Sequence, residues 1–293
     1  MSKLIIYNQS PYFYHISMSI YKIFNDYMSN DQLLLINCTD HNFCSSDLYL
    51  LFMPLLNMNQ MNDIKYIIYN FEQFTTTKIW SESYIYFLKN ALYVIDYSIL
   101  NICKLNEMGI NAFFLPYVST GLNKYDNSLN MSIKINEQKN SNITKDIDIL
   151  FIGTLNTKRK EWLNKIETSK YNVKILTNSY YNESLEYFAR SKILLNVHYY
   201  HGKSILEVAR IIPALENNCI ILTEKSDDEY YNYMYKNVIK KINIFNINDK
   251  IDEILSNYEN ELKNSKKLFE IMSSEIIKED IFELIRLIKN IIN

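Results

Sequence analysis

Polar residues at the ends of two apolar runs have the types and spacing needed to hold an anionic ligand. Asn196 and His198 end one run, and Glu224 ends the next. Between the two runs, Lys203 and Ser204 open a helical pattern that extends to about residue 217. A cation and a hydroxyl at a helix start suit a diphosphate, because helix N-termini attract anions. The alternative is that Ser204 only caps the helix.

Two charged residues follow on this helix, which is otherwise apolar. Glu207 and Arg210 lie on adjacent turns, and buried charges need partners. A carboxylate in this place suits the diol of a sugar, and a guanidinium suits a phosphate. The alternative is a structural ion pair, since residues three apart on a helix are neighbours. We expect both side chains to contact a ligand.

A second candidate anion site follows the apolar run that ends at residue 152. Gly153 and Thr154 come directly after the run, and Lys158 and Arg159 open the next helical pattern. Because the chain has only 4 glycines, a glycine here suggests a close approach of backbone to ligand. The alternative is an ordinary turn with a solvated basic face. Thr177 and Asn178 end the following strand, and we expect them at the same edge of the sheet.

Two residues of the first half could exchange a proton with a bound substrate. Glu72 follows the run Tyr66–Tyr69, and His15 follows the loop after the first strand. Either could act as a general base on a hydroxyl. A histidine on a helix face is more often structural, so Glu72 ranks first. Asp96 follows another strand, but helix capping beside Ser98 explains its position.

Strands alternate with helices through both halves of the chain, which indicates a doubly wound α/β fold in each. The polar, aperiodic stretch from 125 to 145 is typical of a linker or exposed loop. We therefore expect one Rossmann-like domain over 1–124 and a second over 146–277. Ligands of such sheets bind at the carboxyl ends of the strands, which is where the candidate residues lie.

The composition excludes several classes of function. The 293 residues are 48% hydrophobic, and the formal net charge of −2 with no long basic run argues against a nucleic-acid partner. No apolar run reaches the length of a membrane span, and the start MSKLIIYNQS is too short in apolar residues for a secretion signal. The 4 cysteines show no metal-type pairing, so we expect free thiols and a cytoplasmic protein. The wealth of Asn, Ile, Lys and Tyr suggests an AT-rich genome.

Two segments resemble known motifs, a P-loop and a metal-binding triplet, but neither is expected to form the corresponding site. The residues Gly202, Lys203 and Ser204 match only the tail of a P-loop, because the earlier glycine position holds Val197. The triplet Asp146-Ile147-Asp148 imitates a metal-binding motif, but it lies at the entrance of a strand, opposite the ligand-binding end. We expect no catalytic metal.

Three stretches, two of them in two parts, resemble glycosyltransferases of the B-type (GT-B) fold, as in group-one or family-four proteins. FIGTLNTKRKEWL is similar to the opening of the donor domain, and SKILLNVHYY with LEVARIIPALENNCIILTE is similar to its donor-site unit. YIIYNFEQ and VIDYSILN resemble the first half of glycosyltransferase-like proteins from large DNA viruses and bacteria. The resemblance implies two Rossmann-like domains facing a cleft, with the acceptor on the first and a nucleotide-sugar on the second. It also implies that the last helix, about 278–293, packs back on the first domain.

The resemblance implies sugar transfer from a nucleotide-sugar, UDP- or GDP-linked, to a glycan or other hydroxyl acceptor, without a cofactor. One position departs from the family. Aligning PALENNCIIL with the family places Pro213 at its ribose-binding glutamate and Asn218 at its glycine. Glu207 is the candidate replacement. A catalytically inactive binding or scaffold protein is therefore the alternative, and a sugar-nucleotide epimerase is weaker because the dinucleotide glycine pattern is missing. Oligomeric state and stereochemistry stay open.

Overall fold

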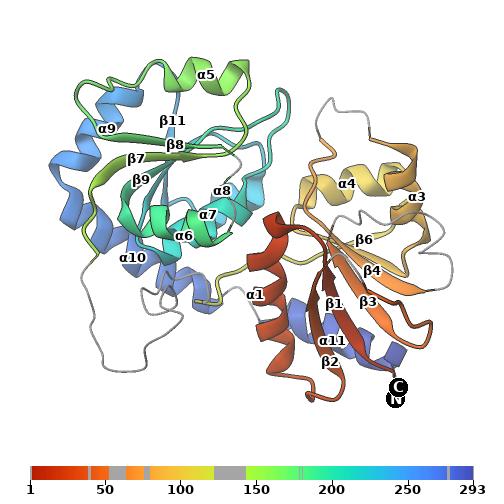
Figure 1. The fold of residues 1–293 in the computed structure, drawn as a ribbon. Helices are drawn as coiled ribbons and strands as arrows, with labels where there is room; N and C mark the ends of the chain where they lie inside the picture. The colour runs from red at the N-terminus through yellow and green to blue at the C-terminus, as the bar shows by residue number, and fades with distance from the viewer. Residues whose placement is uncertain are drawn as a thin grey trace, which may run out of the picture.

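The computed structural model contains two α/β lobes (Figure 1). It describes residues 2–38, 41–52, 64–75, 80–121, 143–177, 179, 181–275 and 278–292. The first lobe is built on β1 to β6, and the second lobe is built on β7 to β11. The predicted α/β class with two doubly wound sheets is confirmed.

The first lobe contains a six-stranded parallel sheet in the order β2-β1-β3-β4-β5-β6. Its strands are β1 (Leu4–Asn8), β2 (Leu33–Asn37), β3 (Leu48–Phe52), β4 (Lys65–Asn70), β5 (Tyr93–Asp96) and β6 (Ala112–Phe114). The connecting helices include η1 (Pro11–Phe13), α1 (Tyr14–Asn25), α3 (Glu82–Asn90) and α4 (Ile99–Glu107). The order reverses between β1 and β3, and such a switch point opens a crevice at the carboxyl ends of the strands.

The second lobe contains a five-stranded parallel sheet in the order β11-β10-β9-β7-β8. Its strands are β7 (Ile147–Ile152), β8 (Val173–Leu176), β9 (Ser191–Asn196), β10 (Ile220–Glu224) and β11 (Ile239–Ile242). The helices between them are α5 (Thr157–Leu163), α6 (Tyr181–Arg190), α7 (Val208–Glu216) and α8 (Glu229–Met234). Its switch point lies between β7 and β9, so the segments after these two strands are adjacent.

Alternate residues of the strands enter different cores, because successive side chains point to opposite faces of a sheet. In β1, Leu4 and Ile6 join the core under α1, whereas Ile5 and Tyr7 join the core under α3 and α4. The second sheet is covered on both faces in the same way. Burial on both faces explains why these strands are continuous apolar runs in the sequence.

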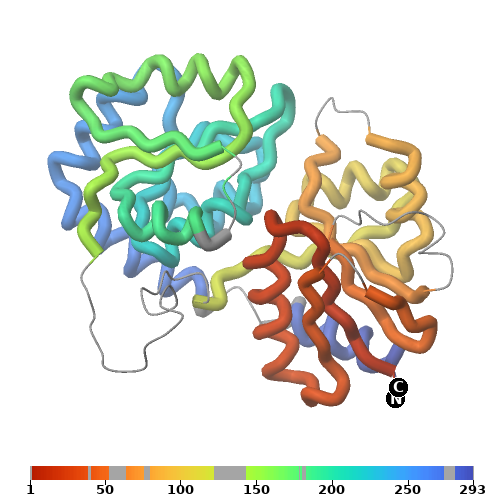
Figure 2. Tube along the Cα trace, viewed as in Figure 1, coloured from red at the N-terminus to blue at the C-terminus, as the bar shows by residue number. Residues whose placement is uncertain are grey.

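Three helices complete the chain after β11, namely α9 (Ile247–Ser256), α10 (Tyr258–Glu275) and α11 (Lys278–Ile292). The first two belong to the second lobe, and α11 lies beside the sheet of the first lobe (Figure 2). Phe282 of α11 contacts Tyr27 with ring centroids 4.9 Å apart, and Leu284 is buried. The chain therefore passes between the lobes twice. Within its described part, no helix is both long and apolar enough to cross a bilayer.

Two details of the helices differ from the sequence-based expectation. The helix expected from residue 204 begins at Val208, because the amide and hydroxyl of Ser204 donate to the carboxylate of Asp227, at 2.8 and 3.2 Å. Ser98 precedes α4, but its hydroxyl donates to Asp228 of the second lobe instead of capping the helix. In both cases a contact distant in sequence replaces the local one.

Polar contacts also join the lobes. Glu216, at the end of α7, accepts hydrogen bonds from the Ser119 hydroxyl and from the amides of Thr120 and Gly121, the latter two at 3.1 and 3.0 Å. The Tyr231 hydroxyl donates to the Tyr97 carbonyl at 2.7 Å. Glu216, Tyr97 and Tyr231 are buried, so these contacts fix the lobes against each other.

Candidate functional site

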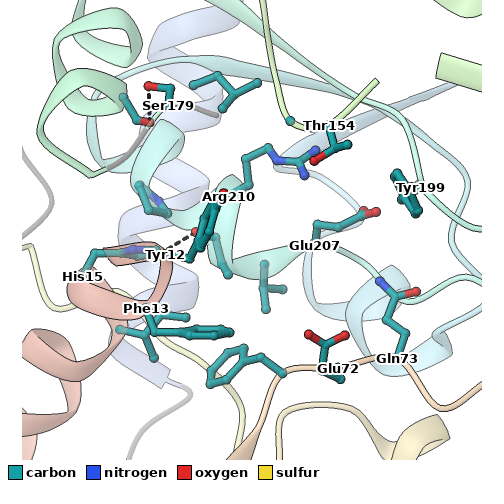
Figure 3. A pocket seen from close by; sticks show the side chains of 18 of the residues that line it. Tyr12, Phe13, His15, Glu72, Gln73, Thr154, Ser179, Tyr199, Glu207 and Arg210 are labelled. Carbon is teal, nitrogen blue, oxygen red and sulfur yellow. Dashed lines mark hydrogen bonds between the residues drawn. The ribbon is translucent and has the colours of Figure 1, made fainter. Parts of the chain in front are cut away.

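A cavity of about 550 Å³ lies between the two lobes, at the carboxyl ends of both sheets (Figure 3). The first lobe contributes Tyr12, Phe13, His15, Ile16, Phe71, Glu72, Gln73 and Tyr97 to its wall. The second lobe contributes residues after β7, in α6, after β9 and in α7, among them Gly153, Thr154, Arg159, Ser179, Ser184, Tyr199, Glu207, Arg210 and Pro213. The cavity is therefore an interlobe site.

Two guanidinium groups approach the backbone at Gly153, directly after β7. A Cβ atom at this position would lie 3.0 Å from Nη1 of Arg159 and 3.1 Å from Nη2 of Arg210. Gly153 has φ +143°, a conformation that side chains rarely permit. Glycine is therefore required here for two reasons, the backbone angle and the space taken by the arginines.

The position of Arg159 is fixed by its own helix and by the neighbouring strand end. Asn156 caps α5 by accepting from the Arg159 amide at 2.9 Å. The side chain donates from Nε to the carbonyl of Val197 at 2.9 Å and from Nη1 to the carbonyl of Thr154 at 2.8 Å. Its guanidinium also faces the Tyr199 ring, 5.2 Å from the centroid. Only 2% of Arg159 is exposed, so this cation is held rigidly inside the protein.

Glu207 is the carboxylate nearest to the two arginines, and it belongs to a buried hydrogen-bond network. Its Oε2 accepts from Nδ2 of Asn196 at 2.9 Å and from Nδ1 of His198 at 2.7 Å. Asn196 in turn accepts from Nη1 of Arg210 at 3.0 Å. Oε1 of Glu207 is buried, makes no hydrogen bond to the described residues and lies 4.0 Å from Nη2 of Arg159. That oxygen keeps acceptor capacity at the cavity wall.

Burial and mutual contacts determine the charges in this network. Burial, followed by the repulsion of Arg210, lowers the pKa of Arg159 to about 10, so its guanidinium stays charged at neutral pH. Burial would raise the pKa of Glu207, but His198 and Arg210 outweigh it and hold that pKa well below its ordinary value. Burial lowers the pKa of His198, but Glu207 outweighs this and raises it. The wall from the second lobe therefore carries two guanidinium groups against one carboxylate, that of Glu207.

Behind this wall, Glu224 and Lys158 form a second ion pair. Lys158 Nζ lies 2.8 Å from Oε1 of Glu224, whose Oε2 accepts from the His198 amide at 3.1 Å. These residues contact the network but do not line the cavity. They orient the segment after β9, which carries the carbonyl that anchors Arg159.

His15 connects the lobes at one end of the cavity. Its Nε2 donates to the carbonyl of Ala209 in α7 at 2.9 Å, as Figure 3 shows. Burial lowers its pKa to about 4, although the bond to Ala209 acts in the opposite direction. His15 is therefore neutral at pH 7 and holds its proton on Nε2.

Glu72 projects from the opposite side of the cavity, on the segment after β4 (Figure 3). Its amide donates to Oδ1 of Asn70 at 3.1 Å, and its carbonyl accepts from Nδ2 of Asn101 at 2.7 Å. Asn101 and Asn70 also contact the buried carboxylate of Asp96. Gln73 donates to the Ile205 carbonyl of the second lobe at 3.4 Å. The backbone that presents Glu72 is thus held by buried side chains.

The structure brings together most of the predicted site residues but not all. Gly153, Thr154, Arg159, Glu207 and Arg210 share the cavity with Glu72 and His15, whereas Asn196, His198 and Glu224 lie behind its wall. The remaining predicted residues fall elsewhere, as follows. Lys203 is exposed and its carbonyl accepts from Thr75, Ser204 is bound to Asp227, Thr177 is exposed at the end of β8, and Asn178 lies outside the described residues.

Sequence reasoning missed the aromatic side of the cavity. Tyr12, Phe13 and Phe71 line it, and each follows a strand of the first sheet. The strand-end rule that selected Glu72 could have found them, but aromatic residues suggest core packing first. The triplet Asp146 to Asp148 lies far from the cavity edge, paired with Arg190 and Lys192. The described residues contain no cluster of three or more His, Cys, Asp or Glu side chains suited to a metal ion.

No protein-family model and no curated protein sequence matches the chain. Solved structures do match. HepE of Anabaena, in complex with UDP and glucose, is 9% identical with a TM-score of 0.58, over 99% of both chains. T4 phage BGT, in complex with UDP and Mn²⁺, is 12% identical with a TM-score of 0.60, over 100% of both. A glycosyltransferase from Rickettsia africae is 10% identical with a TM-score of 0.53, over 100% of this chain and 99% of that one.

These similarities extend over whole chains and not over one lobe. They confirm the fold predicted from the sequence, two Rossmann-like lobes of the GT-B type. At such low sequence identities the similarity establishes the fold alone. The chemistry of the cavity depends on its own residues.

Proposed function

We propose that this chain is a cytoplasmic glycosyltransferase that moves a sugar from a nucleoside-diphosphate sugar to a hydroxyl acceptor, without a catalytic metal, in glycan biosynthesis. One observation carries the proposal: Arg159 and Arg210 meet at Gly153 inside the interlobe cavity, with one nearby carboxylate. Two buried guanidiniums require more negative charge than Glu207 supplies. A diphosphate supplies it, and guanidinium groups bind phosphate oxygens in pairs.

The donor would lie on the second lobe, with its diphosphate at Arg159, Arg210 and the backbone after Gly153. Oε1 of Glu207 has acceptor capacity for a hydroxyl of the donor, and Tyr199 offers a ring beside the cations. We favour a UDP-linked or GDP-linked sugar. The solved neighbours hold UDP, which makes UDP the first candidate to test.

In the proposed reaction, an acceptor hydroxyl oxygen forms a bond with the anomeric carbon of the donor sugar. The bond from that carbon to the phosphate oxygen breaks, and the nucleoside diphosphate leaves with the electron pair. The two guanidiniums stabilise the charge that develops on it, in place of a divalent metal. Glu72 would take the hydroxyl proton, because its carboxylate faces the donor side across the cavity (Figure 3). His15, bound to Ala209 through Nε2, is the second candidate for this role.

Binding of free nucleotides tests the donor site directly. UDP or GDP should raise the melting temperature of the protein in the presence of EDTA, because a ligand of the folded state stabilises it. Arg210→Ala should weaken that binding by about 10-fold to 100-fold, the value of one charge-assisted hydrogen bond. Arg190→Ala is the matched control, since Arg190 pairs with Asp146 away from the cavity. If no nucleotide binds, the proposal fails.

A catalytically inactive relative of these enzymes is the second candidate, and Pro213 favours it. Pro213 lines the cavity where the aligned family has a carboxylate, and Asn218 takes the family's glycine position with φ +60°. Such a protein would bind the nucleotide-sugar without turnover. Release of nucleotide from a panel of donors, with and without acceptors, separates the two candidates.

A further inference from the structure

The two walls of the cavity differ in charge. The second lobe contributes two guanidinium groups, whereas the described residues of the first lobe that line the cavity include no lysine or arginine. Burial lowers the pKa of His15 to about 4, so at neutral pH it adds no positive charge. Glu72 is the charged residue that the first lobe presents there. The described residues of the first-lobe wall therefore offer no cation to an anionic acceptor.

The same wall is aromatic. We use the term aromatic wall for Tyr12, Phe13, Phe71 and Tyr97, all of which line the cavity. Phe71 stacks on Tyr97 with centroids 5.1 Å apart and an interplanar angle of 12°, and Phe13 lies 6.0 Å from Phe71. Tyr12 is 54% exposed. The stacked pair is fixed by packing, so a ring-sized surface is in place before a ligand binds.

Glu72 and Gln73 stand beside these rings. A carboxylate accepts hydrogen bonds and an amide both donates and accepts them, which is the set of contacts that a polyol requires. Aromatic rings cover the apolar C–H face of a pyranose, while polar groups bind its rim. A purely apolar chain would offer the carboxylate of Glu72 no hydrogen-bond donor, and a phosphate or sulfate would meet it as a like charge.

We infer that the acceptor is an uncharged saccharide, which stacks one ring on Phe71 and Tyr12 and directs a hydroxyl at Glu72. The inference rests on the proposed function, because it names the acceptor class of the same site. A nucleic acid, a sulfated glycan or another polyanion would instead need cations on this wall.

Calorimetric titration of the full chain tests the inference, with and without saturating UDP. The ligands are neutral gluco-, galacto- and manno-oligosaccharides, sulfated forms of the same sugars, and a single-stranded DNA oligomer. We expect at least one neutral saccharide to bind, and its sulfated form to bind about tenfold or more weakly. Phe71→Ala should weaken saccharide binding by about tenfold, the value of one aromatic contact, with UDP affinity unchanged.

Three further variants serve as controls for the saccharide-binding test. Phe71→Tyr keeps the ring and should keep the saccharide. Tyr12→Ala removes an exposed ring of the aromatic wall, and so tests the wall even if Phe71→Ala does not fold. Tyr233→Ala removes a tyrosine that is 69% exposed in α8 and does not line the cavity, and it should change nothing.

The outcomes separate the two proposals. Binding of UDP without any neutral saccharide, or tighter binding of the sulfated sugars or DNA in the presence of saturating UDP, would overturn the acceptor inference alone. Unchanged saccharide affinity in both Phe71→Ala and Tyr12→Ala would overturn it as well. Saccharide binding without UDP binding would refute the donor site and leave the acceptor inference standing.

Discussion

Replacing Gly153 by alanine tests the arginine pair without removing a charge. At φ +143° a side chain strains the backbone, at a cost of about 1–3 kcal/mol in folding stability. The new methyl group would lie 3.0 Å from Nη1 of Arg159 and 3.1 Å from Nη2 of Arg210, where ordinary contacts begin at 3.4 Å. Arg159 is anchored by two carbonyls, so Arg210 is the group that can move.

The expected effect on ligand affinity follows from that displacement. Loss of one charge-assisted hydrogen bond costs about 1.5–3 kcal/mol, so Gly153→Ala should weaken UDP binding by about 10-fold to 100-fold. Calorimetric titration with UDP measures this, and urea unfolding measures the strain separately. Circular dichroism of the variant confirms that the affinity refers to folded protein.

Gly109→Ala is the matched control. Gly109 also has a positive φ, +75°, but no described atom lies within 4 Å of its missing Cβ. This variant should lose stability, by about 1–2 kcal/mol for the left-handed backbone, and keep its affinity for UDP. The reasoning is refuted if folded Gly153→Ala binds UDP like the wild type, or if Gly109→Ala loses affinity equally.

Three further predictions follow from other contacts. His15 has a pKa of about 4 in the folded chain against 6.5 unfolded, so between these pH values the unfolded chain binds more protons. The free energy of unfolding should therefore fall as pH drops from 6.5 to 4. In His15→Gln, whose amide can still donate to Ala209, urea denaturation should show a smaller fall over this pH range. Glu72→Gln should lower kcat by about 10²-fold or more without raising the KM of the donor. A raised donor KM in nucleotide-release assays would instead indicate that this carboxylate binds the donor. Glu216→Ala should reduce the free energy of unfolding by about 3 kcal/mol, because it leaves the donors of residues 119–121 without their acceptor; a loss below about 0.5 kcal/mol, typical of a surface change, would contradict this.

The sheets of both lobes could be predicted because their strands are buried on two faces. Runs such as Leu48–Phe52 and Ile147–Ile152 are apolar throughout, and polar residues mark where each strand ends. The strand-end rule then selected Gly153 and Glu72, since parallel strands present their carboxyl ends at one edge. Glu207 and Arg210 were selected as charged residues on an otherwise apolar helical pattern. These predictions needed only local sequence.

Contacts between distant residues account for what the sequence did not predict. Asp227 binds Ser204 across 23 positions, which moves the start of α7 and removes Ser204 from the cavity. His15 meets Ala209 from another lobe, and no pattern near either residue indicates that bond. Phe71 was not predicted as a site residue, because an aromatic side chain gives the same sequence pattern in a core as in a cavity wall.

The double passage of the chain between the lobes has a mechanical consequence. The first passage follows β6 and the second precedes α11, which packs under the first sheet. A cut in the chain between β6 and β7 would sever the first passage, yet α11 on the C-terminal piece would still pack on the first lobe. A truncation before residue 278 would remove α11 and with it one layer of the first lobe. The apolar residues beside Leu284 would then be exposed to solvent.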